Sequence, residues 1–281
     1  MIRLLADSTC DLSPDLKEQH SIITIPLNIV MEDKSYFDGE EITPDEIYEW
    51  ADANRTTPKT AAVSYEKAQA LLQPYIDAGD DIIFIGISEQ MSTTNNVMRL
   101  LAEDLEYPKL YVVDSMNLST GIGLQLLYAA QLIRQGRTAK EIVHLLEDRR
   151  GKVRASFVVE TLTYLARGGR CSAATALLGN TLKLKPQIVV ENGTMKVGKK
   201  YRGKQNSVLL KYTQELEDLL LHADPSCVFI THSGCDMETI APIKAYLNSL
   251  NHFENIYVTR AGGVISSHCG PGTLGVLFYS E

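Results

Sequence analysis

Short apolar runs alternate with amphipathic stretches along the first half of the chain. The run at 82–87 is typical of a strand buried on both faces, and the polar turn 88–96 follows it before an amphipathic stretch begins. Strands that alternate with helices at this spacing predict a mainly parallel sheet covered on both faces. Further strands are predicted at 2–6, 21–31 and 110–113, and helices begin near Ser13-Pro14, Thr43-Pro44, Ser64, Ser92, 118 and Thr138.

The pattern changes after Lys152. The dipeptide Asn192-Gly193 is a hairpin signal, and it leads into a strand at 195–201. Other strands are predicted at 155–160, 187–190, 227–231, 255–260 and 274–279, with one long helix at 207–221. The sequence therefore predicts an α/β protein of two lobes that abut. Residues 1–152 form a three-layer α/β/α lobe with a mainly parallel sheet, and residues 153–281 form a two-layer lobe with a mixed sheet.

Composition narrows the class of protein. A hydrophobic content of 44% and a charged content of 22% are ordinary for a folded soluble protein. A net charge of −8 argues against a nucleic-acid partner, and no apolar run is long enough to predict membrane insertion. Asp7 interrupts the only early apolar run, which is too short for a secretory segment. The five scattered cysteines predict reduced thiols in a cytoplasmic protein, and no zinc or other metal-ligand spacing occurs.

Several polar turns compete as functional sites. The turns that follow parallel strands meet at one crevice. Ser92 or Thr94 could cap a helix or, with that helix's free N–H groups, bind an anion. His268 lies in a stretch bounded by glycines and is either a structural histidine or a binding residue. The five turns are 7–11, 56–64, 88–96, 168–172 and 266–272, and the segment 54–64 is predicted to be a loop.

Two further signals are weaker. The stretch Gly168-Gly169-Arg170 lacks the lysine of a Walker loop, and no GxGxxG opens a helix, so nucleotide binding has little support. A cluster of four basic residues follows the hairpin and is either a solvated face or a docking patch for an acidic partner. Its members are Lys199, Lys200, Arg202 and Lys204.

Taken together and in order, these turns resemble the DegV family of bacterial fatty-acid-binding proteins over essentially the whole chain. Each of the following stretches corresponds to a motif of that family: Asp7-Ser8-Thr9-Cys10-Asp11-Leu12, Phe37-Asp38-Gly39-Glu40-Glu41-Ile42, Pro58-Lys59-Thr60, Val113-Asp114-Ser115, Gly168-Gly169-Arg170, Leu184-Lys185-Pro186 and His268-Cys269-Gly270-Pro271-Gly272.

The resemblance implies a DegV-like fold with a long-chain fatty acid between the lobes and no other cofactor. Its carboxylate would bind Thr60, Ser92 and His268, with Arg170 near the head group. It also implies a carrier without chemistry of its own, which presents the carboxylate to an ATP-dependent fatty acid kinase subunit. That partner would form an acyl phosphate for phospholipid synthesis.

The chain departs from the family pattern at two loops. The family's SQPS is Ala61-Ala62-Val63-Ser64 here. SSGLSGT is SEQMSTT, which removes both glycines and would allow Thr93 or Thr94 to replace Ser92. Two alternatives stay open. The chain could be the substrate lobe of a small-molecule kinase similar to dihydroxyacetone kinase, in which His268 bonds to a carbonyl. It could also be a scaffold that uses only the basic cluster.

Overall fold

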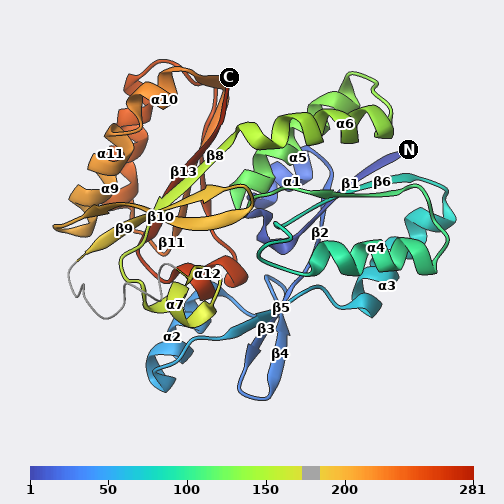
Figure 1. Cartoon of the computed structure of the whole chain (residues 1–281), viewed down its shortest axis with the longest axis horizontal. Helices are drawn as coiled ribbons and strands as arrows, with labels where there is room; N and C mark the ends of the chain where they lie inside the picture. Colours follow the sequence, from blue (N-terminus) through green and yellow to red (C-terminus); the bar gives the residue numbers. More distant parts are fainter. Residues whose placement is uncertain (173–183) are drawn as a thin grey trace.

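The computed structural model describes residues 1–172 and 184–281 (Figure 1). Its first layer is a four-stranded, wholly parallel sheet in the order β2-β1-β6-β7. The strands are β1 (Ile2–Asp7), β2 (Ile22–Ile25), β6 (Asp81–Gly86) and β7 (Leu110–Asp114). Leu4 and Leu5 enter different apolar cores because successive side chains of a strand point to opposite faces. The predicted three-layer arrangement is confirmed.

Helices cover both faces of the parallel sheet. α1 (Pro14–Gln19), α5 (Thr120–Arg134) and α6 (Ala139–Arg149) contribute to one core, while α3 (Tyr65–Asp77) and α4 (Thr94–Asp104) contribute to the other. Ser13, Ser64 and Thr138 accept hydrogen bonds from the first turns of α1, α3 and α6, as their sequence patterns predict.

The chain after residue 152 forms a six-stranded mixed sheet in the order β10-β9-β8-β13-β11-β12. Its strands are β8 (Val153–Val158), β9 (Lys185–Glu191), β10 (Thr194–Tyr201), β11 (Ala223–Ser233), β12 (Ile256–Arg260) and β13 (Thr273–Ser280). β9 and β10 pair in antiparallel fashion around Asn192-Gly193, which confirms the hairpin. The predicted single helix at 207–221 is wrong, because α9 (Gln205–Gln214) ends before α10 (Glu217–Leu221) begins.

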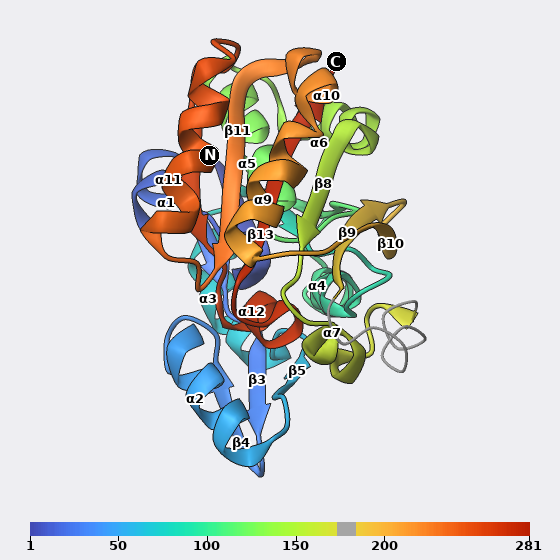
Figure 2. The ribbon, with the colours of Figure 1, turned by 90° about the vertical axis from the view of Figure 1, so that its left-hand side faces the viewer.

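One apolar core joins the two sheets. α9, α10 and α11 (Met237–Ser249) cover one face of the mixed sheet, and its other face shares a core with α5 and the parallel sheet (Figure 2). A side chain on Gly123 of α5 would lie 3.3 Å from the Cys10 carbonyl oxygen. This glycine therefore lets α5 approach the first βα turn closely.

A small antiparallel sheet, β4-β3-β5, was not predicted. Its strands are β3 (Asn28–Met31), β4 (Lys34–Phe37) and β5 (Lys59–Ala61), with α2 (Pro44–Asn54) beside them. The prediction of a loop at 54–64 is wrong at β5, which pairs with β3 through Ile29 and Thr60. Figures 1 and 2 both show this sheet and α2 below the short helix α12 (Gly263–Cys269).

The remaining described elements are short. They are the 3-10 helices η1 (Ser8–Cys10) and η2 (Arg150–Lys152), and α7 (Thr163–Gly168). Across residues 1–172 and 184–281, no helix combines the length and apolar character needed to cross a bilayer.

Candidate ligand-binding pocket

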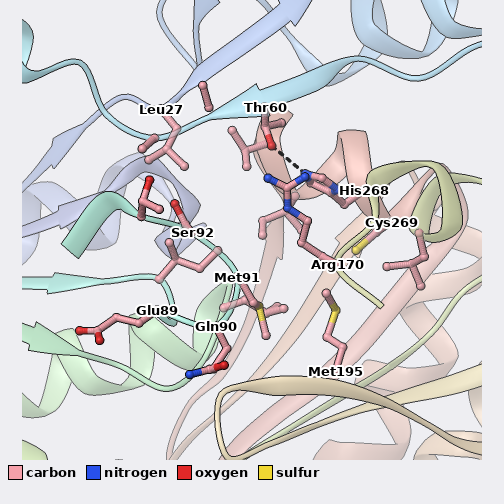
Figure 3. Close-up of a pocket in the computed structure, with 18 residues that line it drawn as sticks. Leu27, Thr60, Glu89, Gln90, Met91, Ser92, Arg170, Met195, His268 and Cys269 are labelled. Carbon is pink, nitrogen blue, oxygen red and sulfur yellow. Dashed lines mark hydrogen bonds between the residues drawn. The ribbon is translucent and has the colours of Figure 1, made fainter. Parts of the chain in front are cut away.

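A pocket of about 450 Å³ lies where the first-lobe turns, the small sheet and α12 meet (Figure 3). This volume is within the range of about 300–1,000 Å³ that is typical of small-molecule sites. Its lining combines a few polar side chains with a mainly apolar wall. The lining residues are Leu27, Thr60, Ala61, Ala62, Ile87, Glu89, Gln90, Met91, Ser92, Thr93, Leu118, Leu165, Arg170, Met195, Val264, Ile265, His268 and Cys269.

Thr60 and His268 form the polar centre of the pocket. Thr60 lies on β5 and His268 in the last turn of α12, and a hydrogen bond of 2.8 Å joins Thr60 Oγ1 to His268 Nε2. The prediction that His268 lies in a glycine-bounded turn is wrong, because the residue is helical and only 9% exposed. Helical geometry directs the imidazole toward the small sheet, 208 positions away along the chain.

Burial makes His268 a neutral hydrogen-bonding group. Burial, followed by the nearby charge of Arg170, lowers the pKa of the imidazole to about 4, so the ring carries no charge at neutral pH. The cation beside it is the exposed Arg170, whose guanidinium Figure 3 shows next to the Thr60–His268 pair. In the described part of the chain, His268 Nδ1 has no hydrogen-bond partner.

The position of the His268 ring explains why the first residue of the Gly168-Gly169-Arg170 stretch is a glycine. A side chain at this position would place its Cβ 2.2 Å from His268 Nδ1, so only glycine leaves room for the ring. The following glycine, Gly169, ends α7 with φ +69°, and Arg170 then donates to the Gly168 carbonyl at 2.8 Å. This turn therefore brings Arg170 to the pocket beside His268.

Ser92 reaches the same pocket from the first lobe. The backbone N–H groups of Met91 and Ser92 both donate to the Ser88 carbonyl, which closes a turn just before α4. Ser92 and Thr93 line the pocket, whereas Thr94 is fully buried outside it and its hydroxyl lies 2.9 Å from Ser92 Oγ. Ser92 Oγ also accepts from the Thr94 backbone N–H at 3.3 Å, so Ser92 takes part in the helix start as well.

The β9-β10 hairpin packs over this turn. Ser88 Oγ donates to the Gly193 carbonyl at 2.8 Å, and a Cβ on Gly193 would lie 2.5 Å from that hydroxyl oxygen. The hairpin thereby brings Met195 to the pocket wall, where Figure 3 shows it below Arg170 and beside Met91. The two sheets therefore contribute to one site.

The apolar wall was not predicted from the sequence. Leu27, Leu165 and Met195 come from three separate segments, and nothing in the sequence marks their side chains as lining a pocket. Cys269 also lines the pocket, and burial followed by the charge of Asp11 raises the pKa of its thiol to about 12. A thiol that is protonated at neutral pH is not a nucleophile, so this side chain contributes apolar surface.

The basic cluster lies outside the pocket. Lys199, Lys200, Arg202 and Lys204 are all exposed, and Lys199 forms an ion pair of 2.9 Å with Glu215. Its β10 portion continues from the segment that carries Met195. Among residues 1–172 and 184–281, no group of three or more His, Cys, Asp or Glu side chains is arranged to hold a metal ion.

The fold and pocket define a class of α/β ligand-binding protein with a largely apolar pocket that has a hydroxyl–imidazole–guanidinium centre. A family model described as "Uncharacterised protein, DegV family" matches residues 1–281. The chain belongs to the DegV family. A DegV domain-containing protein of Deinococcus radiodurans is 32% identical over 276 residues, which is 98% of this chain and 97% of the relative.

Two solved structures are similar over almost their whole length. One, entitled "Fatty Acid Binding of a DegV family Protein from Thermus thermophilus", has a TM-score of 0.88 and 30% identity over 100% of this chain and 99% of that one. The other, a stearic-acid-binding protein of Eubacterium ventriosum, has a TM-score of 0.86 and 25% identity over 100% and 98%. DegV family proteins with solved structures, such as the one from Thermus thermophilus, thus bind fatty acids.

Proposed function

We propose that the protein binds a long-chain fatty acid in this pocket and presents its carboxylate to a partner kinase. The observation that carries the proposal is the hydrogen-bonded Thr60–His268 pair beside Arg170 at one side of a mainly apolar pocket. A carboxylate needs several donors when it leaves water, and an acyl chain needs apolar surface. The lining supplies both.

The head group would be held by neutral donors and one cation. The Thr60 hydroxyl can donate to a carboxylate oxygen while His268 Nε2–H donates to Thr60 Oγ1, which orients the hydroxyl. Ser92 and Thr93 line the facing turn, and Arg170 supplies the positive charge. Because an acyl tail buries far more surface than the head group, these groups would orient the ligand more than they determine its affinity.

The tail would determine most of the affinity. Burial of a methylene contributes about 0.8 kcal/mol, so a tail of about 14 methylenes gains roughly 11 kcal/mol before the costs of binding. The wall residues named above are Leu27 between β2 and β3, Leu165 in α7, Met195 in β10 and Cys269 in α12. We therefore infer that residues 1–152 and 153–281 act as two lobes around one acyl chain.

The second part of the proposal concerns the kinase step. The carrier itself would do no chemistry, and an ATP-dependent kinase subunit would phosphorylate the bound carboxylate in the cytoplasm for phospholipid synthesis. The exposed basic cluster, Lys199, Lys200, Arg202 and Lys204, would dock an acidic surface of that partner. Complementary charge of this kind speeds association and selects the partner.

Native mass spectrometry after mild purification tests the binding proposal. We expect a mass increment equal to a long-chain fatty acid, which solvent extraction removes and added palmitic acid restores. The alcohol of the same chain length is the matched ligand control, because it has the tail without the carboxylate. Tight binding of a triose together with no binding of any fatty acid would overturn the proposal in favour of a small polar substrate.

A further inference from the structure

Three buried carboxylates lie outside the pocket but next to the elements that form it. Asp7, Asp11 and Asp38 are 0%, 5% and 4% exposed, and none of them lines the pocket. A buried carboxylate is costly unless hydrogen bonds compensate for the lost water. The groups that each carboxylate binds therefore indicate what it holds in place.

Asp11 and Asp38 bind the first residues of the helix that carries His268. Asp11 Oδ1 accepts from the Gly262 N–H at 2.8 Å, and Asp38 Oδ1 accepts from the Gly263 N–H at 2.7 Å. A Cβ on Gly263 would lie 2.8 Å from that Asp38 oxygen. The two carboxylates thus satisfy N–H groups that a helix start leaves without internal partners.

The small sheet holds both ends of α12. Asp38 directly follows β4 and binds the start of the helix, while Thr60 on β5 binds His268 near its end. β3 lies between these two strands and pairs with each. The position of the imidazole therefore depends on both contacts.

Asp7 holds the other polar turn. Its Oδ2 accepts from the Ile87 N–H at 2.8 Å, directly before the turn that leads to Ser92. Its Oδ1 accepts from the backbone N–H of Thr9 at 3.0 Å and from the Thr9 hydroxyl. Asp7 and Asp11 flank the three-residue helix η1. One short segment therefore makes two contacts: Asp7 binds the backbone that leads to Ser92, and Asp11 binds the start of the helix that carries His268.

We propose that Asp7, Asp11 and Asp38 are positioning residues of the fatty-acid site, with Asp7 aligning the Ser92 turn and the other two aligning His268. Only the test by ligand affinity rests on the proposed function. It goes beyond that function because these side chains would act without touching the ligand.

The hydrogen-bond pattern distinguishes Asp11 from Asp7. Asp11 faces one backbone N–H and one hydroxyl, that of Ser119, and a hydroxyl can reverse to accept. Asp11→Asn can therefore keep both bonds. Asp7 faces a backbone N–H on each oxygen, so Asp7→Asn must leave one backbone donor without an acceptor.

The first measurement uses ligand-free protein with ¹⁵N-labelled histidine, with the His268 ring signals assigned through His268→Gln. We expect Asp11→Ala and Asp38→Ala to shift or broaden these signals, and Asp11→Asn to preserve them. Asp7→Asn should instead perturb the backbone amide signals of the turn that leads to Ser92, which are recorded on uniformly ¹⁵N-labelled protein because residues 87–92 contain no histidine. The control is Asp33→Ala, because Asp33 is exposed in the β3–β4 turn.

The second measurement is the ratio of affinities for palmitic acid and for the alcohol of the same length. We expect Asp11→Ala to lower this ratio about tenfold or more, with Asp11→Asn and Asp33→Ala near wild type. If wild type binds no fatty acid, the proposed function fails, and the ring signals still test the positioning role.

Two results would overturn the positioning role. One is an unchanged His268 spectrum in folded Asp11→Ala and Asp38→Ala. The other is an Asp11→Asn variant that fails to fold or that loses the wild-type ring signals, because the proposed bonding predicts that asparagine suffices at this position.

Discussion

Replacement of Thr60 by valine separates head-group recognition from tail burial. Valine has nearly the shape of threonine and favours a strand, so β5 should keep its pairing with β3. The change removes the hydroxyl that lies 2.8 Å from His268 Nε2. A bound carboxylate would then lose one donor, and the imidazole would lose the partner that orients it.

The expected size of the effect follows from the hydrogen bond that is lost. A hydrogen bond to a charged group contributes about 1.5–3 kcal/mol, and its loss corresponds to a dissociation constant about 10 to 150 times larger. The apolar wall is untouched by the change, and the tail contributes most of the binding energy. Affinity for palmitic acid should therefore fall, while affinity for the alcohol of the same length should stay near its wild-type value.

Competition titrations of delipidated protein against both ligands measure this difference directly. Thr56→Val is the matched control, because Thr56 is exposed and does not line the pocket. Equal losses for the acid and the alcohol in Thr60→Val would refute the reasoning, since they would mean that the hydroxyl supports the pocket's shape and does not recognise the carboxylate.

Three other predictions concern space, charge and docking. Gly168→Ala should displace His268, because the new Cβ would lie 2.2 Å from its ring. This variant should lower the ratio of the affinity for the acid to that for the alcohol about tenfold. The control Gly151→Ala should leave that ratio unchanged, because a Cβ at this position meets nothing within 4 Å. Burial raises the pKa of Asp11 from 3.8 to about 8, so the folded protein holds a proton that the unfolded chain has lost, and stability should fall as pH rises between these values. Asp11→Asn should flatten that decline in urea unfolding at pH 5 and pH 8, and parallel curves for the two proteins would contradict it. Lys200→Glu should slow acyl-phosphate formation with a fatty acid kinase subunit at low salt while leaving fatty-acid affinity unchanged, and equal rates would exclude this residue from docking.

The elements that the sequence predicts well are those with a local signal. The parallel sheet follows from apolar runs such as 82–87, and the hairpin from Asn192-Gly193. Helix starts at Ser13 and Thr138 follow from caps that lie within three residues of the groups they bind. In each case the stabilising partners are neighbours in the sequence.

Two of the mispredicted elements, β5 and α12, depend on distant partners. β5 is three residues long, and its strand conformation comes from pairing with β3. α12 is composed of poor helix formers such as Gly263 and Ser266, and its first N–H groups are bound by Asp11 and Asp38 from more than 220 positions away. The pocket's wall is assembled in the same way, so the order of family motifs identifies polar candidates but not the apolar lining.

The backbone explains why this chain can lack the two glycines of the family's SSGLSGT motif. They correspond to Gln90 and Thr93, and neither residue has a positive φ here. The turn is closed by two hydrogen bonds to the Ser88 carbonyl, from Met91 and Ser92, which need no left-handed residue between them. Side chains other than glycine therefore fit without strain, and Ser92 still lines the pocket. The substitutions instead add two polar side chains to the pocket lining, so their effect should be on the polarity of the pocket and not on the path of the chain.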